Sequence, residues 1–307
     1  MKIAVTSPSF SKNPVLIEEV RKIAPEAKLN DSGIRLKGEA LYEFIKDADT
    51  LIVGLEQMDE ALLSRLPDLK MIAKYGVGLN NVDLEYCEKR GISIGWKGGV
   101  NRLSVAEMTL GFMLMLCRNL YYTSNQLKSG TWNKSGGFQL SGKTIGLLGI
   151  GFVGKEVVKL LQPFNCRILV NDIRDQSDYY YSHDLIEKSK TDIYKEADII
   201  SLHMPLDELN HNLINKEAFA HMKESAFVIN TARGGIINEE DLKEALLTGR
   251  LAGAAIDAYE TEPPEDKKLL EIPNLITTPH IGGNSREAVE AMGMSAINEV
   301  KKFYHIF

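Results

Sequence analysis

The stretch Thr144–Val158, TIGLLGIGFVGKEVV, has three glycines, Gly149, Gly151 and Gly154, between an aliphatic run and a helical pattern. The aliphatic run predicts a buried strand, and the pattern after the glycines predicts an amphipathic helix. In a dinucleotide-binding turn the first glycine allows the tight bend and the second lets the backbone approach a pyrophosphate. The third lets the helix pack closely against the strand. Because a lone GxGxxG is equally typical of a plain strand–helix bend, its surroundings decide between the two.

The sequence after this turn favours a dinucleotide. The helix that begins with Phe152 and Val153 leads to a second strand, CRILVND, which ends in Asp172, 18 residues after Gly154. An acidic residue near this offset accepts hydrogen bonds from the adenosine ribose and disfavours a 2′-phosphate. Asp172 could instead be a turn residue, and Arg174 two positions later is a residue type that accommodates a 2′-phosphate. The whole pattern predicts NAD as the cofactor.

Strands and helices alternate on both sides of this stretch. The apolar runs of the first hundred residues are KIAVTS, ADTLIVGL, LKMIAKYG and ISIGW. Those of the second block are TIGLLGI, CRILVND, ADIISLHM, SAFVINTA, LAGAAIDA and LITTPH. Such alternation is typical of parallel sheets covered by helices. We therefore predict an α/β protein with two Rossmann-like, doubly wound parallel-sheet domains, for which 307 residues suffice.

Composition and charge exclude several classes of protein. A formal net charge of −6 argues against a nucleic-acid-binding face. Three widely spaced cysteines, Cys87, Cys117 and Cys166, indicate neither a disulfide framework nor a zinc site. The N-terminal MKIAVTSPSF predicts a first strand and not a signal peptide. We therefore expect a cytoplasmic protein without a metal.

The segment 104–120, SVAEMTLGFMLMLCRNL, is the most membrane-like part of the chain. Glu107 and Arg118 leave about ten uninterrupted apolar residues between them, well short of the ~20 that a membrane span needs. We interpret it as one buried helix of a soluble protein. It lies either in the core of a domain or in an interface between subunits.

Polar residues follow the strands of the second block, at the sheet edge where ligands bind in such folds. They include His203, Asn230, Thr231, Arg233, Asp257, Glu262 and His280. An arginine can grip a carboxylate with two hydrogen bonds, and a histidine can give a proton to a forming alkoxide near neutral pH. Each also has a simpler interpretation: His203 as a cofactor neighbour, Glu262 as a solvated loop charge, and His280 as a capping or core histidine.

Several motifs together resemble the D-isomer-specific 2-hydroxyacid dehydrogenases, the family that includes phosphoglycerate dehydrogenase. In chain order they are KYGVGLNNVD (74–83), VNRLSVAE (100–107), GIGFVG with Asp172, NTARGGIINEEDL, DAYETEP and TPHIGG. The resemblance implies that Arg233 binds the substrate carboxylate and keto oxygen, and that Glu262 pairs with His280, the catalytic acid/base. Val77 and Gly78 would bind the substrate carboxylate through backbone N–H groups, with Arg233 and His280 completing the substrate site. The implied cofactor-binding residues are Gly149, Gly151, Phe152, Val153, Gly154, Asp172, His203, Thr231, Ala232, Asp257 and Gly282.

The resemblance also implies a domain organisation. A discontinuous substrate domain would comprise residues 1–97 plus 282–307, and the NAD-binding domain would comprise residues 98–281. The active site would lie in the cleft between them, and a homodimer would form through the helix 104–120. The partner molecule would be a small 2-hydroxy or 2-keto acid.

The expected reaction is hydride transfer between NAD and a small D-2-hydroxy acid, with 3-phosphoglycerate as an alternative substrate. Phosphoglycerate-specific members often carry an arginine where this chain has Gly54, Leu55 and Glu56, and we expect Glu56 to repel a phosphate. Lys74 or Arg102 could replace that arginine. Glu262 argues against formate, because formate dehydrogenases carry a glutamine there, and phosphite enzymes carry a lysine near Val77. A third alternative is an NAD(H)-sensing scaffold that binds proteins, which an intact Arg–Glu–His set disfavours.

Overall fold

The computed structural model describes residues 1–306, which form two compact units. The first unit comprises Met1–Asn101 and the chain from Gly283 onward, and the second comprises Arg102–Gly282. Each unit contains one parallel β-sheet with helices on its faces, which confirms the predicted fold class. The sequence-based boundaries, 97/98 and 281/282, stay a prediction about functional domains.

The sheet of the first unit has the strand order β2-β1-β3-β4-β5, with every pair parallel. Its strands are β1 (Ile3–Val5), β2 (Lys28–Leu29), β3 (Thr50–Val53), β4 (Met71–Lys74) and β5 (Ser93–Gly95). The chain adds β2 on one side of β1 and β3 on the other. The crevice between the carboxyl ends of β1 and β3 is therefore the switch point of this sheet.

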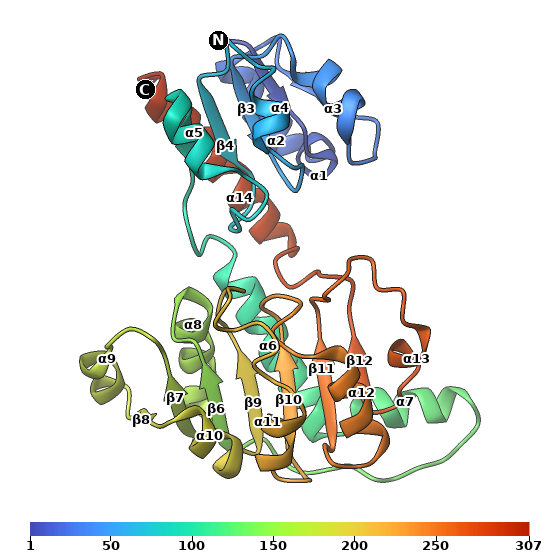
Figure 1. Ribbon diagram of the computed structural model, residues 1–307. Helices are drawn as coiled ribbons and strands as arrows, with labels where there is room; N and C mark the ends of the chain where they lie inside the picture. Colours follow the sequence, from blue (N-terminus) through green and yellow to red (C-terminus); the bar gives the residue numbers. More distant parts are fainter. Residues whose placement is uncertain (307) are drawn as a thin grey trace. The chain divides into compact units, whose positions relative to one another are not determined.

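The last helix of the chain belongs to the core of the first unit (Figure 1). The helices are α1 (Pro8–Ser11), α2 (Pro14–Ile23), α3 (Gly38–Ile45), α4 (Glu60–Leu63), α5 (Leu84–Arg90) and α14 (Arg286–Phe303). On α14, Ala296, Ile297 and Val300 are fully buried in the same cluster as Leu16 of α2. A Cβ on Gly293 would lie 2.3 Å from Leu16 Cδ1, so the two helices pack closely at this glycine.

The sheet of the second unit has the order β12-β11-β10-β9-β6-β7-β8, again wholly parallel (Figure 1). Its strands are β6 (Thr144–Leu148), β7 (Arg167–Asn171), β8 (Ile186–Glu187), β9 (Ile199–Leu202), β10 (Phe227–Asn230), β11 (Gly253–Ile256) and β12 (Leu275–Thr277). After β8 the chain returns to place β9 beside β6. The switch point of this sheet therefore lies between β6 and β9, just beyond the glycine turn.

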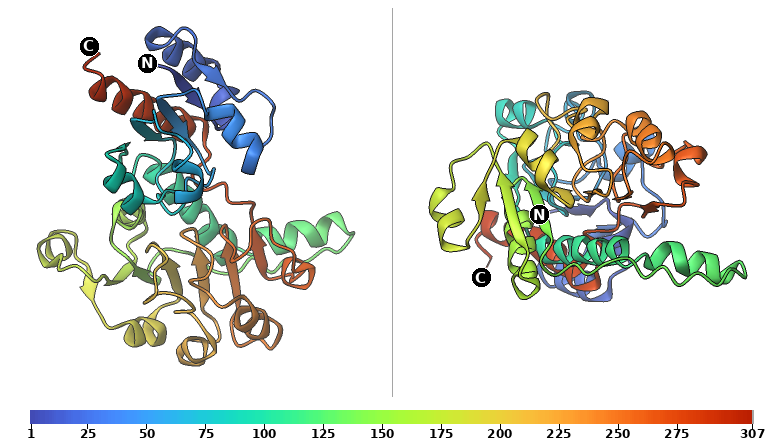
Figure 2. Two further views of the ribbon diagram at one scale, coloured as in Figure 1. Left: turned by 45° about the horizontal axis from the view of Figure 1, so that its top comes forward. Right: turned by 90° about the horizontal axis from the view of Figure 1, so that it is seen from below.

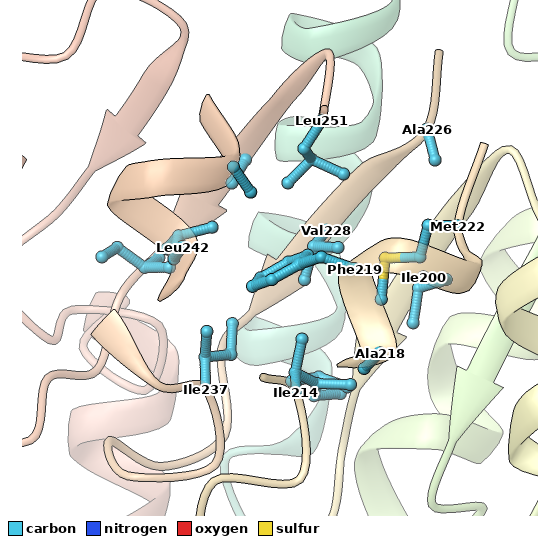
Figure 3. Packing of buried hydrophobic residues seen from close by; sticks show 14 of the residues in the cluster. Ile200, Ile214, Ala218, Phe219, Met222, Ala226, Val228, Ile237, Leu242 and Leu251 are labelled. Carbon is cyan, nitrogen blue, oxygen red and sulfur yellow. The ribbon is translucent and has the colours of Figure 1, made fainter. Parts of the chain in front are cut away.

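Helices cover both faces of this second sheet. They are α6 (Arg102–Cys117), α7 (Leu120–Lys128), α8 (Phe152–Leu161), α9 (Ser177–Ser182), α10 (Lys190–Glu196), α11 (Lys216–His221), α12 (Glu239–Leu247) and α13 (Lys267–Leu270), with a 3-10 turn at Gln162–Phe164. On one face, Phe219 of α11 packs among Ile214, Val228, Ile237 and Leu242 (Figure 3). Burial of such side chains contributes about 1.5–3 kcal/mol each.

The segment expected to form one helix over 104–120 is divided. The helix α6 ends at Cys117, and α7 begins after Asn119, which has a left-handed φ of +52°. Leu120–Lys128 thus forms a second, separate helix. The helix α7 has no buried residue and projects from the second unit (green in Figure 2).

No single helix of the described chain is long and apolar enough to span a membrane. The pair α6 and α7 passes such a test only in combination, and it is bent by 64°.

Candidate active site

The three glycines of the β6–α8 turn have different surroundings. Gly149 has φ +94°, and a Cβ there would lie 2.7 Å from the carbonyl oxygen of His203. A Cβ on Gly154 would lie 2.2 Å from the Gly149 oxygen, so both positions exclude a side chain. A Cβ on Gly151 would meet nothing within 4 Å. Since no side chain caps the ten-residue helix α8 that begins here, this open space suits a pyrophosphate at the helix N-terminus.

Asp172 lies at the end of β7 and is held against the glycine turn. Its Oδ2 accepts a hydrogen bond from Ile150 N at 2.6 Å, and its Oδ1 accepts one from Arg174 N at 2.9 Å. The carboxylate is thus fixed beside the glycine turn. Arg174 is exposed and makes no ion pair within residues 1–306.

His203, at the end of β9, lies directly across the switch point from Gly149. Its Nε2 is 2.9 Å from Ser201 Oγ, and its Nδ1 is buried with no hydrogen-bond partner among the described residues. Burial lowers the pKa of His203 to about 4, so the ring is neutral at physiological pH. A neutral ring with an unpaired nitrogen suits contact with a bound cofactor better than acid catalysis.

The loop after β10 carries Arg233. Asn230 fixes this loop, because its Nδ2 donates to Arg233 O at 2.8 Å and its Oδ1 accepts from Ala232 N at 3.0 Å. The guanidinium is half-buried, and burial lowers its pKa while the charge of Glu262 raises it. Thr231, which is 7% exposed, has its Oγ1 2.9 Å from Thr109 Oγ1 on α6.

The structure brings Glu262 and His280 together, although 18 residues separate them. His280 Nδ1 lies 2.7 Å from Glu262 Oε1. The two side chains are 43% and 41% exposed, so a small molecule can reach the imidazole. A carboxylate at Nδ1 fixes the orientation of the imidazole ring.

Asp257 holds the loop that carries His280. This carboxylate is 1% exposed and accepts hydrogen bonds from Thr278 Oγ1 at 2.6 Å, Ile281 N at 2.8 Å and Gly282 N at 2.7 Å. The sequence patterns did not single out Thr278, although its place two residues before His280 was a usable signal. Contacts of Asp257, Thr231, Ala232, Gly282, Phe152 and Val153 with a cofactor stay predictions.

The expected substrate loop of the first unit follows β4. Gly76 has φ +133°, Val77 and Gly78 are partly buried, and Trp96 Nε1 donates to Val77 O at 3.0 Å. Asn81, which the sequence analysis did not identify, anchors the loop by donating to Glu56 O at 2.6 Å and to Gly54 O at 3.2 Å.

Glu56, which we expect to repel a phosphate, lies inside the first unit and does not extend into solvent. Glu56 is 2% exposed, and its Oε2 accepts hydrogen bonds from Thr6 Oγ1 at 2.6 Å and Gly54 N at 3.0 Å. Lys74 is also buried and donates to Gly54 O and, at 2.6 Å, to Asn81 Oδ1. The Glu56 carboxylate turns inward because the hydrogen bonds from Thr6 and Gly54 compensate the cost of its burial.

The described residues 1–306 contain no group of three or more His, Cys, Asp or Glu side chains that could hold a metal ion.

Comparison with known proteins gives concordant results. Residues 110–282 match the family model described as D-isomer specific 2-hydroxyacid dehydrogenase, NAD binding domain. The chain is 36% identical to a D-3-phosphoglycerate dehydrogenase of Methanocaldococcus jannaschii, over 98% of this chain and 57% of the relative. It is 33% identical to a hydroxypyruvate reductase of Thermotoga maritima, over 94% of this chain and 96% of the relative. The crystal structure of an Aquifex aeolicus D-lactate dehydrogenase complexed with NAD and lactic acid superposes with TM-score 0.85 and 26% identity, covering 99% of this chain and 96% of that one.

Proposed function

The chain belongs to the D-isomer-specific 2-hydroxyacid dehydrogenase family, and from this we propose that it reversibly oxidises a small D-2-hydroxy acid to its 2-keto acid with NAD. The observation that carries the proposal is the 2.7 Å His280–Glu262 pair, which lies on the same edge of a parallel sheet as the glycine turn. The chain spans only 57% of the Methanocaldococcus relative, so the activity of that longer enzyme is not transferred as a whole.

The residues present fit an NAD cofactor. The open space at Gly151 and the uncapped α8 N-terminus would hold the pyrophosphate, Asp172 the ribose, and the unpaired His203 Nδ1 a polar group of the bound dinucleotide. When bound, NAD supplies the hydride acceptor for oxidation and, in its reduced form, the hydride donor for the reverse reaction.

The chain's own residues would handle the acid and the proton. Arg233 would bind the substrate carboxylate and stabilise negative charge on the reacting oxygen. During oxidation His280 Nε2 would take the hydroxyl proton as the hydride leaves C2. In the reverse direction it would return the proton to the keto oxygen. Glu262 would orient the imidazole and balance its charge.

The first experiment is the initial rate of NADH oxidation with a panel of 2-keto acids, with and without a terminal phosphate. We expect turnover of unphosphorylated acids such as glyoxylate, pyruvate or hydroxypyruvate. His280→Gln should lower kcat roughly 10²- to 10⁴-fold while NADH still binds, whereas His221→Gln, on an exposed helix end, should leave kcat unchanged. Near-full turnover by His280→Gln would refute the assignment.

The phosphoglycerate alternative stays a second candidate, because the carboxylate of Glu56 is buried and hydrogen-bonded to Thr6 and Gly54. Activity with phosphohydroxypyruvate alone would establish it. Tight NADH binding without turnover of any acid would favour the protein-binding scaffold.

We also propose a homodimer through the segment 104–120 and its continuation α7. Leu120, Leu127 and Trp132 on and beside α7 are 51%, 56% and 77% exposed, a concentration of apolar surface that a second copy would cover. Sedimentation velocity decides this. Three free cysteines are consistent with a cytoplasmic location, which we propose as well.

A further inference from the structure

Tyr259 lies three residues before Glu262 and is 5% exposed. It donates hydrogen bonds through its backbone N–H and through its side-chain hydroxyl. We propose that Tyr259 is a positioning residue that holds His280 against Glu262, an inference that rests on the proposed function. Neither the sequence motifs nor the comparisons assign it a role.

The backbone of Tyr259 contacts the catalytic pair directly. Its N–H donates to Glu262 Oε1 at 3.2 Å, and the same oxygen lies 2.7 Å from His280 Nδ1. Glu262 Oε1 is therefore fixed from two sides. The carboxylate is folded back over its own loop, and it faces the imidazole without further reorganisation.

The hydroxyl of Tyr259 contacts the backbone that carries His280. It donates to Thr278 O at 2.9 Å, and this carbonyl also accepts a hydrogen bond from His280 N at 3.0 Å. His280 has φ +53°, a left-handed conformation that non-glycine residues adopt only at a cost. Burial raises the pKa of Tyr259 to about 12, so its hydroxyl stays a donor at neutral pH. Tyr259, Glu262, His280 and Thr278 thus form a closed ring of hydrogen bonds.

The loop that carries Arg233 also contacts Tyr259. A Cβ on Gly234 would lie 1.8 Å from Tyr259 O, so the turn after Arg233 rests against the Tyr259 peptide. The next N–H, that of Glu260, donates to Glu239 Oε1 on α12 at 2.8 Å. The loops bearing Arg233, Glu262 and His280 therefore meet at Tyr259.

The test is Tyr259→Phe, which removes only the hydroxyl. Its matched control is Tyr194→Phe, because Tyr194 is equally buried in the same unit and its hydroxyl has no partner among the described residues. We expect kcat to fall about threefold to tenfold in Tyr259→Phe, the value of one hydrogen bond, with KM for NADH unchanged. Equal kcat in the two variants would overturn the proposal.

A second readout does not require turnover. In ¹⁵N-histidine spectra of this six-histidine protein, His280 is assigned by its loss in His280→Gln. The wild type should show the single Nδ1–H tautomer that a Glu262 partner selects, and Tyr259→Phe should show a tautomer mixture. An unchanged spectrum would refute positioning. If the wild type reduces no 2-keto acid, the proposed reaction fails while this spectrum still decides the role of Tyr259.

A double-mutant cycle separates positioning from a general structural effect. If the hydroxyl acts through the Glu262–His280 pair, the kcat losses of Tyr259→Phe and Glu262→Gln should be strongly non-additive. Additive losses would contradict the proposal. Should Tyr259→Phe lack a cooperative thermal transition, Glu239→Ala loosens the same loop at Glu260 and should lower kcat in the same direction. An unchanged kcat there would contradict the proposal too.

Discussion

The two sheets have the same parallel, doubly wound architecture but treat their switch points in opposite ways. Between β6 and β9 of the second unit, the chain places glycines and leaves open space at Gly151. Between β1 and β3 of the first unit, the buried carboxylate of Glu56 accepts hydrogen bonds from Thr6 and Gly54. A crevice for a ligand is thus inherent in the topology. The local side chains decide whether a ligand or the protein itself fills it.

The filled crevice has a structural use. Gly54 donates its N–H to Glu56 and its carbonyl accepts a hydrogen bond from Lys74, so one residue connects the two buried side chains. Asn81 extends this network into the loop of Val77 and Gly78. The first unit therefore uses its switch point to shape a loop.

The largest effect is expected where the open crevice depends on glycine. In Gly154→Ala the new methyl would overlap the Gly149 carbonyl, at 2.2 Å, and we expect a loss of more than about 3 kcal/mol in the free energy of unfolding. Urea denaturation measures it.

Gly151→Ala is the matched variant, since its methyl meets no protein atom within 4 Å. We expect unchanged stability but NADH affinity weakened at least about tenfold, measured by NADH fluorescence. Wild-type affinity in Gly151→Ala would show that the pyrophosphate does not lie at this helix N-terminus.

A smaller effect is expected in the filled crevice. Glu56→Ala leaves the Gly54 N–H without its acceptor and should cost about 2 kcal/mol in unfolding free energy, while the NADH dissociation constant stays unchanged. Gln57→Ala, at the exposed neighbouring position, is the control. If Glu56→Ala were more stable than the wild type, the buried carboxylate would lower the free energy of unfolding.

An effect of similar size concerns His203 and pH. The folded protein keeps this ring neutral down to about pH 4, whereas the unfolded chain takes up the proton near pH 6.5. Between these values the unfolded state binds more protons, so stability falls as the pH falls. Acidification from pH 7 to pH 5 should remove about 2 kcal/mol through this residue. His203→Gln should abolish that part of the loss, and His221→Gln should retain it.

The sequence predicted best where one local pattern determines the structure. The glycine turn and the buried strands follow from short-range spacing. The prediction failed where a single residue changes the chain direction, as at Asn119, or where an element is short or weakly patterned. Neither α3 nor the two-residue strand β8 was foreseen.

The candidate site was predicted by residue type but not by arrangement. That Glu262 and His280 would pair came from family resemblance, and the structure shows the contact. The inward turn of Glu56 could not be foreseen, because it depends on Thr6, which lies 50 residues away in the chain and next to it in the fold.

The place of α14 in the first unit has a consequence for biosynthesis. Because Ala296, Ile297 and Val300 complete the core around Leu16, the first hundred residues leave the ribosome without the helix that closes their hydrophobic face. The second unit, Arg102–Gly282, is by contrast synthesised as one continuous segment. During translation the second unit can therefore fold before the first unit is complete, because α14 is synthesised last.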